Sequence, residues 1–187
     1  MRQTDMAHRI SATKSLLFVI DVQKKLAPAM TNGETAIANN AKLLQAASLL
    51  EVPSLVSEQY PQGIGHTVDP LSALIDKDRV FEKMTFSCME EGAIQQALAQ
   101  SGRHQLIVGG METHVCVLQT VLDLLDDGYQ VFVVADAVAS RTMDNKELGL
   151  ARMRQCGAQI VSTEMVLFEW LGRAGTDPFK QVLPLIK

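Results

Sequence analysis

Short, almost wholly apolar runs alternate along the chain with longer amphipathic runs. Leu16 to Val22 is apolar except for Asp21, which is typical of a strand buried on both faces of a sheet. Between Ile37 and Leu50 apolar residues recur instead at helical spacing. Further apolar runs predict strands at 54–58, 79–84, 106–108, 131–135 and 158–162. The remaining amphipathic runs predict helices at 91–100, 113–127, 145–155 and 164–171.

Alternation of strands with helices implies parallel pairing through right-handed crossovers, and so a three-layer α/β fold with six strands. A length of 187 residues suits one domain spanning 1–187. We expect an N-terminal extension at 1–13 and a C-terminal tail at 172–187. The longest irregular stretch, Tyr60 to Pro70, is expected to be a functional loop.

Composition narrows the possible partners. The formal net charge is −4 and no Lys/Arg cluster stands out, which argues against binding to nucleic acid or to an anionic membrane. No apolar run is long enough to span a bilayer, and the polar N-terminus does not resemble a secretion signal. The three cysteines, Cys88, Cys116 and Cys156, do not form a disulfide framework, so a cytoplasmic protein is expected.

Three chemically competent residues are predicted at the carboxyl ends of strands, the edge at which open parallel sheets bind ligands. Asp21 ends the first strand, Lys83 ends the third, and Cys116 opens the helix after the fourth. We therefore expect a small-molecule site at this edge.

Cys116 has the strongest local argument. If Thr113 is the N-cap, Cys116 lies in the first helical turn, where the helix dipole favours the nucleophilic thiolate. The backbone amides of Cys116 and Glu112 could also hold an oxyanion. The alternative is that Cys116 is a small apolar residue of a buried helix, and the helix alone does not separate the two interpretations.

Asp21 and Lys83 are each ambiguous alone but informative together. A carboxylate in an apolar strand is costly unless it is paired or lies at the strand's end. As a base, Asp21 would take the thiol proton and later activate water, whereas its plainer interpretation is a loop or capping carboxylate. Lys83 is either a solvated surface charge or an inward cation that favours both anions.

The chain resembles the isochorismatase-like cysteine hydrolases over nearly its whole length. The resemblance rests on Asp21-Val22-Gln23, on Lys83, on the segment from Gly109 to Val117, and on Asp136-Ala137 and Ser140-Arg141. The chain is most similar to the subgroup called isochorismatase domain-containing proteins, through the segments Ser57 to Pro61 and Lys83 to Cys88.

The resemblance implies a doubly wound sheet in the order 3-2-1-4-5-6 and a catalytic triad of Asp21, Lys83 and Cys116. It also implies a cis peptide between Met111 and Glu112, which turns the amides of Glu112 and Cys116 toward one oxyanion. In amidohydrolase relatives the thiolate attacks an amide carbonyl, ammonia leaves, and a thioester is hydrolysed.

Two departures from the family's patterns refine this expectation. Nicotinamidases of the superfamily carry an Asp-x-His-Pro metal motif, and Tyr60 stands here at the position of its histidine, so we expect neither a metal nor another cofactor. Enzymes that act on isochorismate lack the cysteine, so Cys116 points away from that reaction.

Other residues have weaker assignments. We expect the substrate to contact Gln23, Tyr60, Phe86 and Ser87. His114 is expected in a loop or interface role, since residues two apart on a helix do not face each other. Apolar residues from Phe168 to Ile186 predict either a homo-oligomer interface or packing of the tail onto the domain.

Two functions follow from these expectations. The first is a metal-independent cysteine hydrolase that acts on a small amide or ureide. The alternative is a scaffold or binding protein that retains the fold. A complete triad favours the enzyme.

Overall fold

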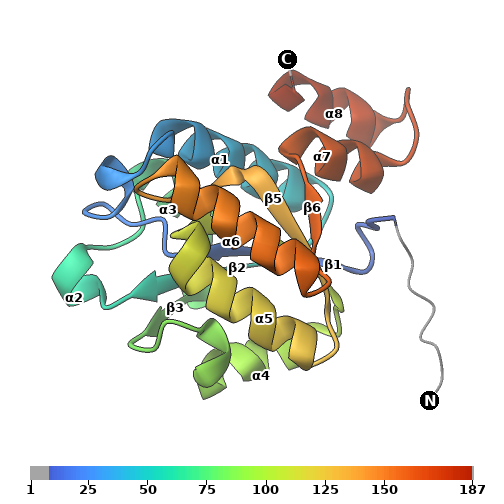
Figure 1. Cartoon of the computed structure of the whole chain (residues 1–187). Helices are drawn as coiled ribbons and strands as arrows, with labels where there is room; N and C mark the ends of the chain where they lie inside the picture. Colours follow the sequence, from blue (N-terminus) through green and yellow to red (C-terminus); the bar gives the residue numbers. More distant parts are fainter. Residues whose placement is uncertain (1–8, 187) are drawn as a thin grey trace.

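The computed structural model describes residues 9–186 and contains a six-stranded sheet in the order β3-β2-β1-β4-β5-β6 (Figure 1). All the strand pairings are parallel, so the predicted fold class and strand order are confirmed. The strands are β1 (Ser15–Ile20), β2 (Ser54–Gln59), β3 (Val80–Lys83), β4 (Gln105–Met111), β5 (Gln130–Ala139) and β6 (Gln159–Val161).

Side chains of β1 alternate between two apolar layers. Leu17 and Val19 pack on one face of the sheet, whereas Leu16, Phe18 and Ile20 pack on the other. The first face is covered by α1 (Gly33–Leu49), α7 (Thr163–Leu171) and α8 (Asp177–Ile186). The second is covered by α4 (Gly92–Ser101), α5 (Leu118–Asp126) and α6 (Met143–Gln155). Every β1 side chain is buried, which explains its nearly unbroken apolar sequence.

The register of the central strands brings their carboxyl ends together. Ile20 pairs with Ser57 of β2 and with Gly110 of β4. Gly110 has a φ of 132°, and a Cβ there would lie 2.1 Å from the Ile20 carbonyl oxygen. Only glycine fits this approach of β4 to β1, so Gly110 determines how closely the residues after the two strands can lie.

The predicted helix 113–127 is divided in the structure. Thr113–Val117 forms a π-helical segment (η4), in which the Val117 amide donates to the Glu112 carbonyl, and α5 begins only at Leu118. The N-cap is Glu112, and the Thr113 hydroxyl is buried with no hydrogen-bond partner among the described residues, so the prediction of Thr113 as N-cap is wrong. The apolar residues at helical spacing, Leu118, Val121 and Leu125, all lie in α5, so the pattern did not reveal the π turn that precedes them.

The predicted loop and tail both contain helices. The stretch from Tyr60 to Pro70 includes α2 (Pro61–Ile64) and the start of α3 (Asp69–Ser72). In the tail, α8 buries Val182 in the core layer that also contains α1, and the Trp170 indole donates to the Ser15 hydroxyl at 3.0 Å. For these two side chains the alternative of packing within the chain is confirmed. The 3-10 segments are η1 (Ala27–Ala29), η2 (Lys77–Arg79) and η3 (Cys88–Glu90).

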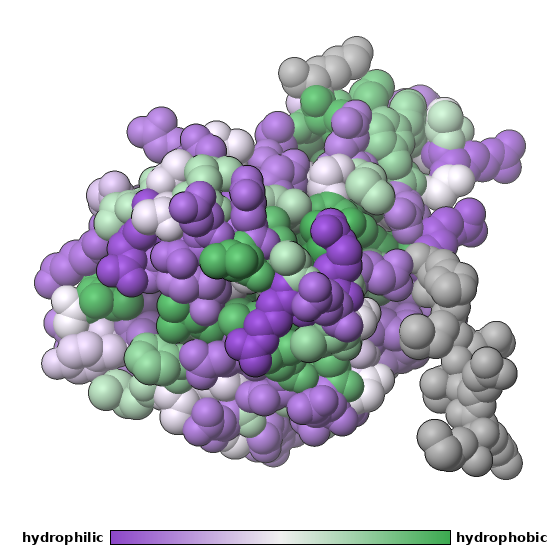
Figure 2. Space-filling model, viewed as in Figure 1, coloured by the Kyte–Doolittle hydropathy of each residue, from purple (hydrophilic) through white to green (hydrophobic). Residues whose placement is uncertain are grey.

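The surface over α5 and α6 mixes hydrophilic and hydrophobic residues (Figure 2). Within residues 9–186, none of the helices has the length and apolar character needed to cross a membrane. Residues 1–8 of the predicted extension, and Lys187, lie outside the described residues.

Candidate active site

The structure brings Asp21, Lys83 and Cys116 to one edge of the sheet. Asp21 directly follows β1 in a left-handed conformation with φ 52°, Lys83 is the last residue of β3, and Cys116 lies in η4 after β4. All three are buried. Strand β2 lies between β1 and β3 and adds two polar side chains to the group, Ser57 and Gln59.

The two oxygens of Asp21 have different partners. The Ser57 hydroxyl donates to Oδ1 at 2.7 Å. Oδ2 lies 2.8 Å from Lys83 Nζ in a fully buried ion pair and has no other partner among the described residues. Oδ2 is therefore the oxygen of Asp21 that can take up a proton without losing the Ser57 hydrogen bond.

Lys83 is surrounded by acceptors. Its ammonium group donates to Gln59 Oε1 at 2.6 Å and lies 3.1 Å from the carbonyl oxygens of Thr85 and Phe86, in addition to Asp21. Burial alone would lower the pKa of Lys83, but the charge and hydrogen bond of Asp21 together with the nearby Cys88 and Cys116 thiols outweigh it, and the pKa is raised. Lys83 is thus a permanent cation at neutral pH, with four acceptors for three hydrogens.

Cys116 rests as a neutral thiol. Burial raises the pKa of its thiol strongly, the charge of Asp21 raises it further, and Lys83 acts in the opposite direction. Lys83 favours the thiolate, but desolvation of the sulfur outweighs its charge. Any nucleophile formed here requires transfer of the thiol proton.

A second thiol lies in the same cluster. Cys88 is fully buried, its Sγ is 3.5 Å from the Ser57 hydroxyl, and burial together with the charge of Asp21 raises its pKa to about 11. Ser57 links it to Asp21. Cys156, by contrast, is exposed at the end of α6.

Two residues predicted to bind substrate instead anchor the backbone. Gln23 is fully buried, donates to the carbonyl oxygens of Gln59 and Gly65, and accepts from the Gln59 amide. Ser87 is the N-cap of η3 and donates to the carboxylate of Asp123. Their side chains hold the loops beneath the site, and the substrate contacts assigned to them are not supported by this geometry.

Tyr60 and Phe86, the other two predicted contacts, lie at the surface and are 47% and 54% exposed. The Tyr60 ring covers Gly63, where a Cβ would come within 2.2 Å of the ring. Phe86 follows the Lys83 loop and supplies a carbonyl oxygen to the ammonium. With Met84, which is 67% exposed, they give the rim beside Lys83 an apolar character.

Gln59 and Ser57 are the residues that the sequence analysis did not assign. They share one face of β2, because residues two apart in a strand point the same way. Gln59 Oε1 lies 4.0 Å from Cys116 Sγ and 2.6 Å from Lys83 Nζ, so it links the thiol and the cation. The sequence signal that could have identified them as site residues was the presence of two polar residues at the carboxyl end of a central strand.

The segment around Cys116 is braced by residues that follow β5. The peptide between Met111 and Glu112 is cis, which confirms that prediction. Arg141 donates to the Glu112 carboxylate from its backbone amide at 3.2 Å and from Nε at 3.0 Å. His114 Nδ1 is 3.0 Å from the Ser140 hydroxyl, so His114 has a structural partner other than Cys116.

The residues at the metal motif of nicotinamidases do not suit a metal. One oxygen of Glu58 accepts from the amide and hydroxyl of Thr67, and the other lies 2.8 Å from His66 Nδ1. Tyr60 is occupied by its contact with Gly63. Throughout residues 9–186, His, Cys, Asp and Glu nowhere gather in a group of three that could hold an ion.

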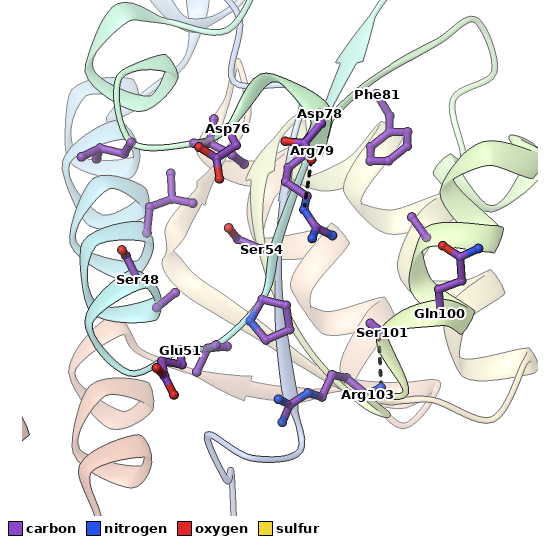
Figure 3. Close-up of a pocket in the computed structure, with 17 residues that line it drawn as sticks. Ser48, Glu51, Ser54, Asp76, Asp78, Arg79, Phe81, Gln100, Ser101 and Arg103 are labelled. Atoms are coloured by element: carbon purple, nitrogen blue, oxygen red, sulfur yellow. Dashed lines mark hydrogen bonds and ion pairs between the residues drawn. The ribbon is translucent and has the colours of Figure 1, made fainter.

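A large cleft lies elsewhere. It has a volume of about 930 Å³ and runs beside the start of β2, between the end of α1 and the end of α4 (Figure 3). In Figure 3 the guanidinium groups of Arg79 and Arg103 lie in this cleft, and Ser54 lies between Arg79 and the helix of Ser48. Ser54 and Gln59 are separated by roughly 17 Å of strand, and no cysteine lines the cleft.

The sheet is doubly wound, and a buried acid, lysine and thiol lie at its carboxyl edge. This combination is typical of a class of hydrolases with an α/β fold. The family model described as the isochorismatase domain matches residues 15–165. The chain belongs to the isochorismatase family.

Named relatives agree with this assignment. The chain is 40% identical over 184 residues to the "Secreted isochorismatase effector Isc1" of Phytophthora sojae, covering 96% of this chain and 87% of the relative. It is 39% identical over 182 residues to isochorismatase domain-containing protein 2A of Mus musculus, covering 96% and 85%. The predicted similarity to that subgroup is confirmed.

Solved structures agree on the fold. A structure called MAR1 ribonuclease from Caenorhabditis elegans has a TM-score of 0.90 and 37% identity, covering 95% of this chain and 92% of that chain. The YcaC protein of Escherichia coli, described as an octameric hydrolase of unknown specificity, has a TM-score of 0.90 at 22% identity, covering 95% and 89%.

Proposed function

We propose that this protein is a cysteine hydrolase that cleaves the carbon–nitrogen bond of a small amide or ureide through a thioester on Cys116. The observation that carries the proposal is the buried contact between Asp21 and Lys83 at 2.8 Å, linked through Gln59 to the Cys116 thiol. A buried base, a fixed cation and a thiol together are what acyl transfer requires.

In the proposed mechanism, Asp21 Oδ2 accepts the Cys116 proton as the sulfur attacks the substrate carbonyl carbon. The negative charge passes from the Asp21 carboxylate through the sulfur to the substrate oxygen, so the net charge of the site does not change. The backbone amides of Glu112 and Cys116 donate hydrogen bonds to the oxyanion of the tetrahedral intermediate. Protonated Asp21 returns its proton to the leaving nitrogen, and ammonia or an amine departs.

The second half of the cycle restores the thiol. Asp21 takes a proton from water, the hydroxide attacks the thioester carbonyl, and the carboxylic acid product leaves as Cys116 regains the proton. Lys83 takes no part in proton transfer, since its hydrogens are bound by Asp21, Gln59 and two carbonyl oxygens. No metal enters the proposed mechanism, because Glu58 and Tyr60 are committed to other contacts.

The ribonuclease name of the C. elegans structure is not carried over to this chain. The formal net charge is −4, and RNA binding depends on neutralising phosphates with Lys and Arg. The buried lysine of the site is already surrounded by acceptors. A neutral substrate suits the site better than a polyanion.

The proposal is tested by the rate at which iodoacetamide alkylates Cys116 as a function of pH. Wild type, Asp21→Asn and Lys83→Met are compared by intact mass, with Cys88 and Cys156 followed separately by peptide mapping. We expect Lys83→Met to slow the labelling of Cys116, because it removes the cation that favours the thiolate. Asp21→Asn removes both the base and a charge that raises the pKa of the thiol, so its expected loss is in ammonia release. Ammonia release from a panel of amides and ureides, with Cys116→Ser as the inactive control, then identifies the substrate.

The opposite result favours a scaffold protein. If Cys116 of the folded wild type labels no faster than the exposed Cys156, and both variants behave like wild type, Cys116 is not an activated nucleophile.

Two further parts of the proposal concern assembly and location. We propose a homo-oligomer in the cytoplasm, with the whole chain as one domain. A 20.5 kDa particle in size-exclusion chromatography with light scattering would contradict the oligomer. Localisation of a tagged full-length chain tests the second expectation, and secretion, as the name of the P. sojae relative indicates for that protein, would contradict it.

A further inference from the structure

Gln59 is held from four sides at the end of β2. Its backbone amide donates to Gln23 Oε1 at 2.8 Å, and its carbonyl oxygen accepts from Gln23 Nε2 at 2.9 Å. Its side-chain Nε2 donates to the Met84 carbonyl oxygen at 2.9 Å, and its Oε1 accepts from Lys83 Nζ at 2.6 Å. Neither the backbone nor the side chain is free to rotate without losing a hydrogen bond.

These partners fix which end of the amide faces the thiol. Lys83 can only donate, and the Met84 carbonyl can only accept, so exchanging the amide oxygen and nitrogen would break both contacts. Gln59 Oε1 therefore faces the cluster, and it lies 4.0 Å from Cys116 Sγ. An acceptor at this position stabilises the S–H form of the thiol and occupies one hydrogen of Lys83.

We propose that Gln59 is a positioning residue whose amide oxygen holds the Cys116 hydrogen and the Lys83 ammonium in place in the resting site. The inference rests on the proposed role of Cys116 as nucleophile. It adds a residue that controls how readily the thiol loses its proton and becomes nucleophilic. In the resting site the thiol is kept protonated, and the charge of Lys83 is directed to Asp21 and Gln59.

Two substitutions of Gln59 should shift the pKa of the Cys116 thiol in opposite directions. Gln59→Leu removes the acceptor of the thiol hydrogen and one of the four acceptors that compete with the thiolate for the three Lys83 hydrogens, so the pKa of Cys116 should fall. Gln59→Glu keeps the shape of the side chain but adds a negative charge beside the sulfur, so the pKa should rise. The other titratable groups that act on Cys116 are Asp21 after β1, Lys83 of β3 and Cys88 of η3, and they are the same in all variants.

The experiment is the pH profile of Cys116 alkylation by iodoacetamide on the full chain, read by intact mass and peptide mapping. A change of one hydrogen bond shifts the profile by about 0.5–1 pH unit, or roughly three- to tenfold in rate below the midpoint. Gln59→Leu should label faster than wild type and Gln59→Glu slower. Gln62→Leu and Gln62→Glu are matched controls, because Gln62 is exposed in α2 and contacts only Glu82 among the described side chains.

The sign of the two shifts separates positioning from mere damage to the fold. Opposite shifts support the inference. Equal profiles, or shifts in the same direction, overturn it while leaving Cys116 as the nucleophile. If Cys116 of wild type does not label above the rate of Cys156, both the proposed function and the inference fail. Gln59→Glu preserves the size of the side chain, and circular dichroism identifies any variant that has lost its fold.

Discussion

The two ends of the sheet differ, because one has a large cleft and the other has the buried charged groups. The amino end of β2 opens into a cleft of about 930 Å³, whose Glu51, Asp76, Asp78 and Arg79 are all exposed to water. At the carboxyl end, the cavity beside Lys83 is only about 130 Å³, yet Asp21 and Lys83 form an ion pair that is fully buried. The larger cleft therefore lies at the amino end of β2, where the charges are ordinary and exposed. The buried charges, and with them the candidate site, lie at the carboxyl end.

The physical reason is the free energy of desolvation. A buried ion pair is weak as a source of stability, because taking both charges out of water offsets much of their attraction. Exposed pairs such as Arg79–Asp78, at 4.0 Å, cost little to form and contribute little. A chain that keeps charges buried at one edge of its sheet has a reason other than stability to do so.

The largest effect should come from Lys83→Met. Removing the cation leaves Asp21 buried without its partner, which should lower the free energy of unfolding by about 3–5 kcal/mol in urea titrations. Lys24→Met is the matched control, because the Lys24–Asp69 pair at 2.6 Å is exposed and should contribute about 0.5 kcal/mol. The double variant Asp21→Asn/Lys83→Met should regain stability. Equal effects at Lys83 and Lys24 would contradict the comparison.

A smaller effect should come from Ser57→Ala. The Ser57 hydroxyl donates to Asp21 Oδ1 at 2.7 Å, and loss of a hydrogen bond to a buried carboxylate should lower the free energy of unfolding by about 1.5–3 kcal/mol.

The same substitution at Ser54 provides the control. Ser54 lies at the start of the same strand, lines the cleft, and makes no side-chain hydrogen bond within the described part of the chain. Ser54→Ala should change the free energy of unfolding by less than about 0.5 kcal/mol. A larger effect at Ser54 than at Ser57 would mean that the cleft, and not the buried cluster, is the more tightly organised end.

The sequence pattern predicted the sheet because strands that are buried on both faces have nearly unbroken apolar sequences. β1 is apolar in both alternating positions, so the interruption by Asp21 stood out as a charge that needed a partner. The neighbours of that charge were harder to predict. Ser57 and Gln59 become important only because the register places β2 beside Asp21 and Lys83.

Other differences have local physical causes. Gln23 and Ser87 are polar residues near the site in sequence, but backbone groups of the adjacent loops take their hydrogen bonds. The resting state of Cys116 depends on how far its sulfur is removed from water, a property of the packed structure that helix position alone does not determine.

Acid should weaken the carboxyl end through Glu58. Burial alone would raise the pKa of Glu58, but hydrogen bonds from Thr67 and His66 outweigh it and hold the pKa below its ordinary value of 4.5. A lowered folded pKa adds stability that is present above the unfolded pKa and is lost as the pH falls through the folded pKa.

This effect is measured as a difference between two proteins. The free energy of unfolding is measured by urea titrations from about pH 6 to about pH 3. At the upper end it should be about 1–2 kcal/mol larger for wild type than for Glu58→Gln, and this difference should shrink as the pH falls. Glu147→Gln, on the exposed face of α6, should show no such pH-dependent difference. A difference that grows as the pH falls would reverse the assigned direction of the Glu58 shift.

The smallest effect is expected in the cleft itself. The Arg79 side chain is about half exposed and its one acidic contact, Asp78, is 4.0 Å away, so Arg79→Ala should change the free energy of unfolding by less than about 0.5 kcal/mol. Alkylation of Cys116 should be unchanged, because the cleft and the thiol lie at opposite ends of β2. A slower reaction of Cys116 in Arg79→Ala would show that a charge far from the buried cluster still affects it. The contrast between the two ends would then describe one coupled site instead of a reactive edge and an ordinary surface groove.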